Sequence, residues 1–523
     1  MINKYKNMLR GKSVFKIMNE RMILIIMIAV QCVLFIAIAQ NKAGFHIDEL
    51  YSYGLANNHY APFVKWKNSD WYSTSKILEY LVAEHGEIFD YGSVIYNQMQ
   101  DVHPPVFYLI LHTICSFFPE VFSKWHGISI NLFFFILTQI TLFFLGKEIM
   151  NDEKRSLIPV FWYGFSTGAL STILFVRMYM MLTAFCTILV YINYKIYKKP
   201  QTIRNYLLLL ITVTLGCLIH YYFYVYAFGV SAFFCIAKLI VKEYRGMIKY
   251  ICTMLLSIMS AIILYPSTIK HIFHGSRGVQ AIENLKTSSL SQNIEGYIKI
   301  IHSQIGIIGF LVILCFFIYY FYKNSEKENM FLKTASIYSY LLLGISLFYI
   351  VVIAKVAPYI ADRYVFCTYP LCILGMSSIM LLLFEVIKNA KLRAIIFITL
   401  LSVIILCTYH QGVNYLYADF NEKVEVLKEN EKLSAVILTE KNWKIDGTLT
   451  TLLETKDFYC TDENNKEIII QELLSEKREK ILLYVSDDYQ DNGSVAREFA
   501  LLSGFENIEY VMEHAYFRIY ALY

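Results

Sequence analysis

The sequence predicts an all-α polytopic membrane protein that carries a small α/β domain outside the membrane at its C-terminal end. Of its 523 residues, 57% are hydrophobic and only 17% are charged, whereas soluble chains have about 25% charged residues. Apolar runs long enough to cross a bilayer recur along residues 22–409. Residues 410–523 are more polar and mix strand-like and helical segments, which favours a separate small domain.

Eleven apolar runs are each expected to form one transmembrane helix, because about 20 mostly apolar residues cross the hydrocarbon core of a bilayer. They lie at 22–40, 126–146, 157–175, 178–197, 205–222, 224–240, 249–265, 304–322, 334–354, 364–385 and 392–409. A further run at 104–118 is shorter and opens with Pro104-Pro105. We expect a short re-entrant or tilted helix there, and a complete crossing is the alternative.

The orientation follows from Lys and Arg, which are enriched in short cytoplasmic loops. Residues 1–21 contain six of them. Further basic loops lie near 195–204, 242–249, 323–333 and 388–393. All of these fall on the side of the N-terminus only if 104–118 does not cross completely. The sequence therefore predicts a cytoplasmic N-terminus, with loop 41–103 and residues 410–523 on the outer face.

The first apolar run has a second interpretation as a cleaved signal peptide. Ala37-Ile38-Ala39 near its end resembles a cleavage site. Against this, a signal core has roughly 7 to 15 apolar residues, and the run at 22–40 is longer. In both cases the loop that follows lies outside.

The predicted organisation has three parts. Residues 1–21 form a cytoplasmic segment, residues 22–409 form the membrane domain with its outer loop 41–103, and residues 410–523 form the extracytoplasmic domain. The strand-like runs of the last part are Ala435–Thr439, Lys480–Val485 and Tyr516–Tyr520, and a helical segment lies between the first two.

Polar residues gather at the outer ends of the predicted helices. They are Asp48, Glu49, Asp101, His103, Arg177, Tyr179, His220, Tyr221, Asp362, Arg363 and Tyr364. Charged residues at membrane depth are costly and therefore mark candidate functional sites. Each also has an ordinary structural interpretation, as a loop acid, a helix-start residue, a packed turn or an arginine anchored at the lipid headgroups. Convergence on one face from distant positions favours a single site.

Five segments resemble motifs of the C-type glycosyltransferase superfamily. Phe45-His46-Ile47-Asp48-Glu49-Leu50-Tyr51-Ser52 resembles its acidic signature. Asp101-Val102-His103-Pro104-Pro105-Val106-Phe107-Tyr108 resembles the His-Pro-Pro element of its protein mannosyltransferase and aminoarabinose-transferase branches, which are similar to glycosyltransferase family 39. Arg177-Met178-Tyr179, His220-Tyr221 and Arg363-Tyr364 are similar to weaker recurrent positions of the bacterial members.

The resemblance covers residues 20–410, and its motifs occur in the expected order and on the expected side of the membrane. Residues 410–523 match no branch closely enough to indicate a substrate. The loop 266–303 is too short for the β-trefoil insertion of the eukaryotic protein mannosyltransferases. The resemblance therefore points to the bacterial branches.

The resemblance implies an inverting transfer of a sugar from a polyprenyl-phosphate carrier, in a single displacement. In this family Asp48 and Glu49 would be the catalytic acids, with Asp48 as the base that activates an acceptor hydroxyl. The donor-phosphate contacts would be Arg177, Tyr179, Arg363 and Tyr364, and the residues that line the site would be Asp101, His103, His220 and Tyr221. Glu49 and His103 are also candidate ligands for a divalent metal ion, which only some branches use.

The partners implied are the polyprenyl-phosphate sugar, membrane lipid, and a glycan, lipid or protein acceptor of the cell envelope, with no nucleic acid. Two other classes of protein compete. A transporter or flippase for a lipid-linked glycan also needs many spans, but it usually has repeated halves and charges near the bilayer midplane. An envelope assembly protein would leave Asp48, Glu49, Asp101 and His103 unexplained.

Overall fold

The computed structural model describes residues 19–200, 202–324, 334–428 and 432–523. The chain folds into two compact units. The first contains residues 1–38, 131–173 and 178–413, and the second contains residues 39–130, 174–177 and 414–523. Loop 41–103 and residues 410–523, which the sequence analysis treated as separate regions, thus fall almost entirely in one unit. Residues 1–18 of the predicted cytoplasmic segment 1–21, and residues 325–333 of the predicted basic loop 323–333, lie outside the described residues.

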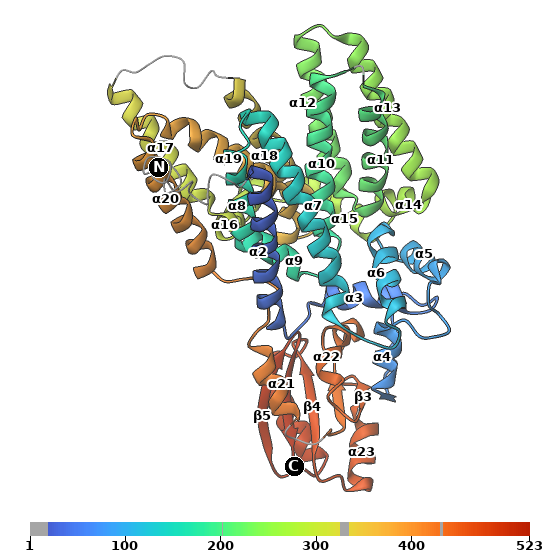
Figure 1. Ribbon diagram of the computed structural model, residues 1–523. Coiled ribbons are helices and arrows are strands. Elements are labelled where there is room, and N and C mark those ends of the chain that lie inside the picture. The colour runs from blue at the N-terminus through green and yellow to red at the C-terminus, as the bar shows by residue number, and fades with distance from the viewer. Residues whose placement is uncertain (1–18, 201, 325–333, 429–431) are drawn as a thin grey trace, which may run out of the picture. The chain divides into compact units, whose positions relative to one another are not determined.

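The first unit is helical (Figure 1). Its long helices are α2 (Glu20–Gln40), α7 (Lys124–Met150), α10 (Tyr179–Lys198), α11 (Ile203–Ile219), α12 (Tyr222–Ile240), α13 (Tyr244–Leu264), α18 (Thr334–Val356), α19 (Tyr369–Phe384) and α20 (Ala390–His410). Two bent pairs complete the set, α8 (Leu157–Phe165) with α9 (Thr167–Leu174), and α16 (Leu290–Ile305) with α17 (Ile307–Asn324). Every one of the eleven predicted runs is represented by one of these helices or pairs.

The prediction of a polytopic all-α membrane protein is confirmed. Within the described residues, eight helices are long and apolar enough to cross a membrane, or up to ten spans if each bent pair is one span. The remaining run forms α11, which is a shorter apolar helix of 17 residues. The run at 104–118 forms α6 (Val106–Phe117). Its 12 residues extend about 18 Å, which is less than the roughly 30 Å of a hydrocarbon core.

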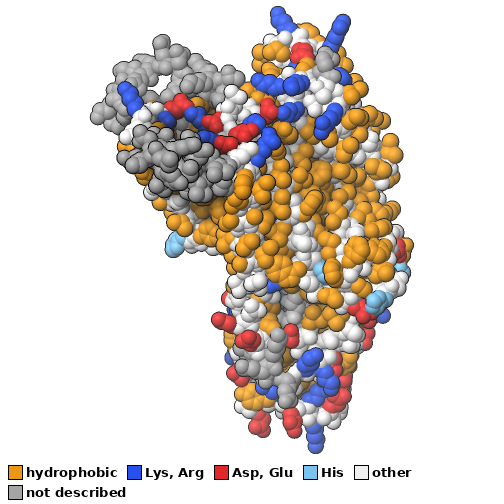
Figure 2. Space-filling view, viewed as in Figure 1, with side chains coloured by type: hydrophobic (Ala, Val, Ile, Leu, Met, Phe, Trp, Pro, Cys, Tyr) orange, Lys and Arg blue, Asp and Glu red, His pale blue; other side chains and the backbone are white. Residues whose placement is uncertain are grey.

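The outer surface of the helical unit is apolar, as expected for contact with lipid. Figure 2 shows a broad hydrophobic surface over these helices, with Lys and Arg gathered at one end of it. Large side chains are strongly exposed there, including Ile25 (67%), Ile240 (75%) and Ile263 (72%). A water-soluble surface rarely exposes such continuous apolar patches.

The two bends have identifiable causes. Gly306 ends α16 with φ of 75°, a left-handed conformation that glycine adopts without strain, and α17 leaves at 91°. Between α8 and α9 the chain bends by 58° at Ser166, whose hydroxyl donates to the carbonyl of Tyr163 (2.7 Å). Both bends therefore follow from local backbone chemistry.

The second unit combines short helices with a six-stranded sheet. The helices of loop 41–103 and its continuation are α3 (Ile47–Asn57), α4 (Ser75–Leu81), α5 (Tyr91–Gln100) and α6. The strands are β1 (Asp70–Ser73), β2 (Ala435–Leu438), β3 (Asp457–Thr461), β4 (Ile481–Ser486), β5 (Ile508–His514) and β6 (Phe517–Leu522), in the order β1-β3-β2-β4-β6-β5. The helices packed with the sheet are α21 (Phe420–Lys428), α23 (Lys466–Glu476) and α24 (Asn492–Leu502). The predicted α/β fold of the C-terminal region is confirmed.

The sheet is completed by a strand from outside the predicted C-terminal domain. β1 pairs antiparallel with β3, with Asp70 opposite Cys460 and Ser73 opposite Asp457. β2 is parallel to both β3 and β4, while β6 is antiparallel to β4 and β5. Trp71 of β1 also donates to Glu472 of α23 (2.9 Å). Loop 41–103 therefore contributes directly to the fold of the C-terminal region.

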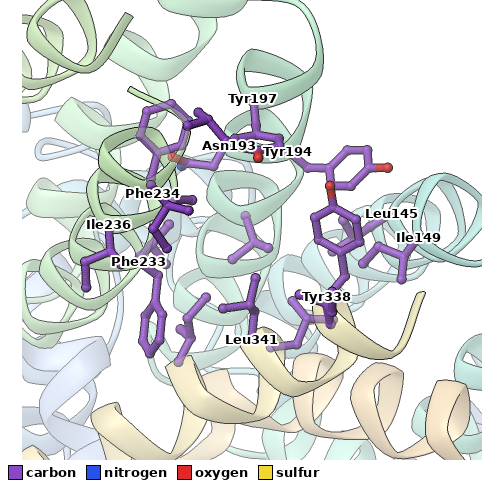
Figure 3. A pocket seen from close by; sticks show the side chains of 18 residues that line it. Leu145, Ile149, Asn193, Tyr194, Tyr197, Phe233, Phe234, Ile236, Tyr338 and Leu341 are labelled. Atoms are coloured by element: carbon purple, nitrogen blue, oxygen red, sulfur yellow. The ribbon is translucent and has the colours of Figure 1, made fainter. Parts of the chain in front are cut away.

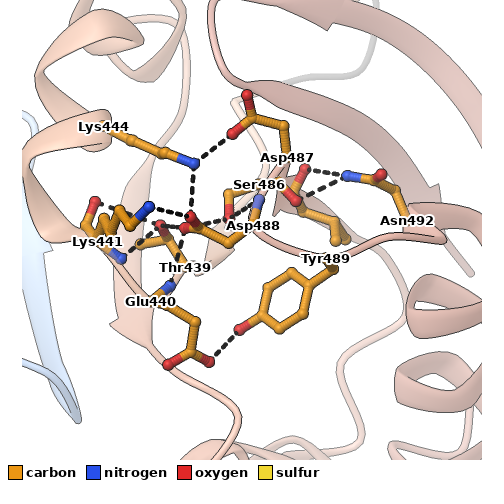
Figure 4. A network of polar contacts seen from close by, with 10 residues as sticks. Thr439, Glu440, Lys441, Lys444, Ser486, Asp487, Asp488, Tyr489 and Asn492 are labelled. Carbon is orange, nitrogen blue, oxygen red and sulfur yellow. Dashed lines mark hydrogen bonds and ion pairs between the residues drawn. The ribbon is translucent and has the colours of Figure 1, made fainter. Parts of the chain in front are cut away.

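A polar network joins the carboxyl ends of the two central parallel strands (Figure 4). The carboxylate of Asp488 accepts from the hydroxyls of Thr439 (3.1 Å) and Ser486 (2.9 Å) and from Lys444 Nζ (2.6 Å). Burial alone would raise the pKa of Asp488, but these donors and the Lys444 charge lower it to about 2. The ionised carboxylate therefore stabilises the folded sheet.

Asp488→Asn is expected to lower the stability of the purified chain at neutral pH by about 2 kcal/mol, from the difference between the folded pKa and about 3.9 in the unfolded state. Because the folded pKa is depressed, this stability is present above about pH 4 and is lost as the pH falls toward 2. Thermal unfolding followed by Trp fluorescence should show the difference shrinking as the pH falls over this range. Asp487→Asn is the control, because the Asp487 side chain is 61% exposed. An equal loss in both variants would contradict the assignment.

Candidate active site

The acidic signature opens α3, where it forms a capping box. Nδ1 of His46 accepts the backbone N–H of Asp48 (3.1 Å), and the Glu49 carboxylate accepts the backbone N–H of His46 (2.7 Å). These reciprocal bonds satisfy amides that the first helical turn leaves unpaired. Acidic side chains are also favoured at the positive end of the helix dipole. The Asp48 side chain remains 24% exposed and is held at a fixed position.

Glu49 lies inside the protein as half of a buried ion pair. Its carboxylate contacts Lys42 Nζ (3.1 Å), and neither side chain is exposed. The other carboxylate oxygen accepts the backbone N–H of Val176 (2.8 Å), while Lys42 also donates to the carbonyl of Tyr415 (2.7 Å). Burial raises the pKa of Glu49 and lowers that of Lys42, and their mutual attraction opposes both shifts. Glu49 therefore ties α3 to two distant segments of the same unit.

A chain of polar contacts leads from Asp101 to the start of α3. His103 Nδ1 lies 2.8 Å from the Asp101 carboxylate, and its Nε2 lies 3.5 Å from a guanidinium nitrogen of Arg177. Because a guanidinium only donates, Nε2 must accept, so the ring proton sits on Nδ1 and is donated to Asp101. Burial alone would raise the pKa of Asp101, but His103 and Arg177 lower it below its usual range.

Arg177 connects this chain to Asp48. Its guanidinium donates to the main-chain carbonyl of Asp48 (3.0 Å) and to the hydroxyl of Ser52 (3.4 Å). It also lies over the ring of Tyr108 at 6.0 Å from the centroid, within the range of a cation–π interaction. Arg177 is only 4% exposed, so its charge is held within the second unit. We call Asp48, Glu49, Asp101, His103 and Arg177 the acidic group.

One turn along α3, Tyr51 belongs to a contact that sequence reasoning missed. Its hydroxyl donates to Asp446 (3.1 Å), and Trp66 Nε1 donates to the other carboxylate oxygen (2.8 Å). Burial raises the pKa of Asp446 to about 6, against the effect of these two donors. The contact fixes α3 to the 3-10 helix η4 (Asn442–Gly447).

The other predicted residues meet in the first unit, around Arg363 of the 3-10 helix η2 (Asp362–Tyr364). Arg363 is 6% exposed and donates to the hydroxyl of Tyr359. Its guanidinium lies over the rings of Tyr359 (5.4 Å) and Tyr364 (5.3 Å). Such ring faces stabilise a partly dehydrated cation.

Further aromatic rings surround Tyr364. Tyr179 contacts both His220 (centroids 5.4 Å apart) and Tyr364 (6.5 Å), and Tyr222 contacts Tyr364 (5.4 Å). Tyr221 instead pairs its hydroxyl with His271 (2.8 Å), so the next residue provides the contact to Tyr364. We call the set Tyr179, His220, Tyr222, Tyr359, Arg363 and Tyr364 the arginine–tyrosine group. Tyr222 directly follows the predicted pair His220-Tyr221 but was not assigned to the site, and Tyr359, four residues before Arg363, was missed.

The arginine–tyrosine group and the basic loops lie at opposite ends of the same helices. Tyr179 begins α10, whereas Lys195 and Lys198 lie in its last turn, about 25 Å away along the axis. Lys195 pairs with Glu148 at the end of α7, and Lys198 lies over Tyr338 near the start of α18 (5.5 Å). The basic end is therefore a shared feature of several helices and lies away from Arg363.

Two apolar cavities of the helical unit are lined by residues other than the predicted ones. One apolar groove of about 440 Å³ is lined mainly by the C-terminal halves of α10 and α12 with parts of α7 and α18 (Figure 3). Tyr194, Tyr197, Phe233, Phe234 and Tyr338 line it. It lies at the end of α10 and α12 that is opposite to Tyr179 and Tyr222. Its walls offer apolar contact and not catalytic groups.

The predicted metal ligands Glu49 and His103 do not belong to a preformed cluster of ligands among the described residues. Among the described residues, no group of three or more His, Cys, Asp or Glu side chains is arranged to hold a metal ion. Glu49 has both carboxylate oxygens engaged by Lys42, His46 and Val176, and His103 is engaged by Asp101 and Arg177. Glu49 and His103 therefore contact other protein groups that they can hold in place.

Comparison with known proteins identifies the fold. No protein-family model and no curated protein matches the sequence. The crystal structure of ArnT from Cupriavidus metallidurans bound to undecaprenyl phosphate matches with a TM-score of 0.52 and 9% identity, over 95% of this chain and 97% of that one. The crystal structure of ArnT from the same organism in the apo state has a TM-score of 0.47 and 9% identity, over 94% and 97%. The chain therefore shares the fold of the ArnT structure that was solved with undecaprenyl phosphate.

Proposed function

We propose that this protein is a membrane glycosyltransferase that moves a sugar from a polyprenyl-phosphate carrier to an acceptor hydroxyl on the outer face of the membrane. The observation that carries the proposal is the likeness, over 95% of the chain, to a protein solved with undecaprenyl phosphate. The acidic group and the arginine–tyrosine group add the chemistry, since one offers a carboxylate base and the other a cation for a phosphate.

The reaction is a single inverting displacement. The Asp48 carboxylate takes the proton of the acceptor hydroxyl as its oxygen bonds to the anomeric carbon. The bond from this carbon to the phosphate oxygen breaks on the opposite side, and its electron pair leaves with polyprenyl phosphate. Arg363 stabilises the charge that develops on the phosphate through bidentate donation. The products are the glycosylated acceptor with inverted configuration and the carrier phosphate.

The other residues act through these two. Arg177 donates to the Asp48 carbonyl and to Ser52, which favours a role in positioning Asp48 over the predicted contact with the donor phosphate. His103 and Asp101 hold Arg177, and Glu49 anchors the helix that carries Asp48. Tyr359 and Tyr364 flank the cation. Tyr179 contacts Tyr364 and His220, while Tyr221 bonds to His271.

The test is a transfer assay with the purified protein in lipid nanodiscs. Polyprenyl-phosphate sugars labelled in the sugar are supplied, and release of unlabelled carrier phosphate is measured with an envelope extract as acceptor. The proposal expects release in wild type and release that is slower by about 100-fold or more in Asp48→Asn. Movement of the intact labelled lipid across a liposome membrane without cleavage would identify a transporter instead.

Arg363→Lys is expected to reduce donor affinity or rate by roughly ten- to a hundredfold, since an unmade charged hydrogen bond costs about 1.5 to 3 kcal/mol and Lys cannot make the bidentate contact. Donor KM and kcat measure the effect, and Arg245→Lys at the exposed start of α13 is the control. The double variant Arg177→Lys/Arg363→Lys shows whether the two arginines bind the same phosphate. Independent effects add, whereas two arginines on one phosphate give less than the sum. Activity within threefold of wild type would make Arg363 a headgroup anchor.

The proposed orientation places the N-terminus in the cytoplasm and the C-terminal region outside. Lys195 and Lys198 lie at the end of α10 opposite to Tyr179, as expected if that end is cytoplasmic. Reporter fusions after residues 200, 245 and 390 are expected to report the cytoplasm, and fusions after residues 60, 280 and 450 the outside. A cytoplasmic signal at 450 would overturn this orientation.

A further inference from the structure

A cavity of about 360 Å³ lies in the second unit beside the first turn of α3. One wall is the segment Gly44–Ile47, and the others come from the C-terminal region. The lining residues outside that segment are Tyr417, Asp419, Phe420, Lys423, Gly447, Glu513, His514, Ala515 and Tyr516. A volume of this size falls within the roughly 300 to 1,000 Å³ of small-molecule sites.

The cavity adjoins the candidate base. His46 lines it, and Nδ1 of the same ring lies 3.7 Å from the Asp48 carboxylate. Two lining residues also contact the buried ion pair, because Lys42 lies over the rings of Phe45 (5.3 Å) and Tyr417 (5.2 Å). A molecule seated here therefore has one edge beside the residue that is proposed to take a proton.

Aromatic rings and carboxylates share the walls. Phe45, Tyr417, Phe420 and Tyr516 contribute rings, and Phe420 packs on His514 with centroids 4.5 Å apart. Asp419 and Glu513 contribute carboxylates whose side chains are 74% and 60% exposed. Flat apolar faces suit the C–H face of a sugar ring, and carboxylates accept hydrogen bonds from hydroxyl groups.

The charge of the cavity argues against an anionic ligand. Lys423 is paired with Asp419 (3.3 Å), so its charge is compensated. Burial and the charge of Lys423 lower the pKa of His514 to about 4, which keeps that ring neutral at physiological pH. Glu513 is likewise paired with Arg518 (3.5 Å), so both carboxylates are compensated and both of these cations are already engaged. This arrangement suits an uncharged ligand better than a phosphate or carboxylate.

We propose that this cavity binds an uncharged sugar residue of the acceptor and presents one of its hydroxyl groups to Asp48. The inference rests on the proposed transferase function and specifies its acceptor as a glycan. The C-terminal region thereby forms the acceptor site, which would explain why it folds together with the loop that carries Asp48.

Binding is tested apart from transfer. Methyl glycosides of glucose, galactose and mannose are added to the full-length protein in nanodiscs, and saturation-transfer NMR measures their dissociation constants. We expect wild type to bind at least one glycoside in the millimolar range, and Asp48→Asn to bind it equally. Glu513→Gln and Tyr516→Leu should each weaken binding by fivefold or more. Glu509→Gln, an exposed carboxylate on the same strand, is the matched control and should leave binding unchanged.

The outcomes separate the two proposals. Glycoside binding that is absent in wild type, or that survives both cavity variants, would overturn the acceptor site even if sugar transfer is observed. Tighter binding of glycerol 1-phosphate than of any glycoside would overturn it as well, because it would show an anionic ligand. Glu513 is exposed, so loss of binding in Glu513→Gln with an unchanged melting temperature cannot be attributed to misfolding. The transferase proposal fails if wild type releases no carrier phosphate, and this result does not depend on the glycoside-binding measurement.

Discussion

Asp48→Asn is expected to reduce sugar transfer by about 100- to 10,000-fold, the usual contribution of a positioned general base. Asn has nearly the same shape but cannot accept the proton of the acceptor hydroxyl. The capping bonds at the start of α3 use the backbone N–H of Asp48 and the side chains of His46 and Glu49, so they persist in the variant. Donor affinity and melting temperature should therefore stay close to wild type.

Variants of two other carboxylates test whether the loss of transfer is specific to Asp48. Asp70→Asn on β1 removes an exposed acid of the same unit, and its activity should equal that of wild type. Asp101→Asn should lower the rate while leaving the reaction measurable, because Asp101 acts through His103 and Arg177. Transfer by Asp48→Asn within threefold of wild type would remove Asp48 from the role of base.

The fold was predictable because the bilayer fixes the length of an apolar helix. Each of the eleven runs corresponds to a helix or a bent pair. The completion of the C-terminal sheet was not predictable in this way. β1 has four residues, and Asp70 pairs with Cys460 across most of the chain. Nothing local in such a short segment specifies a partner so distant in sequence.

The candidate site was predictable where charge and position coincide, as at Asp48, Arg177 and Arg363. The missed residues depend on tertiary contacts. Asp446 is held by Trp66 and Tyr51 from a remote segment, and no sequence spacing indicates this. Lys42 had a usable signal. In the proposed orientation it follows the first span on the outer side, where the positive-inside rule disfavours Lys, and this suggests a buried partner.

The ion pair of Lys42 and Glu49 provides the second large effect. Lys42→Met is expected to destabilise the protein by about 3 to 5 kcal/mol, because it leaves the Glu49 carboxylate buried without its counter-charge. Thermal unfolding in detergent should show a marked fall in melting temperature, and transfer activity should fall with it as α3 loosens. Lys65→Met, at an exposed position of the same loop, is the control for removing a positive charge.

The pH dependence of this variant has a definite sign. Burial already raises the pKa of Glu49, and loss of Lys42 raises it further, so the folded state favours the protonated acid. A group whose folded pKa is raised contributes stability below its unfolded pKa and loses it as the pH rises. The destabilisation of Lys42→Met should therefore be smaller at pH 5 than at pH 8. Adding Glu49→Gln should recover part of the stability at pH 8, since it removes the unpaired charge while keeping an oxygen that accepts from a backbone amide. If the double variant is instead as unstable at pH 8 as the sum of the two single variants, the pair is not coupled, and Glu49 would have to be held by its backbone donors alone.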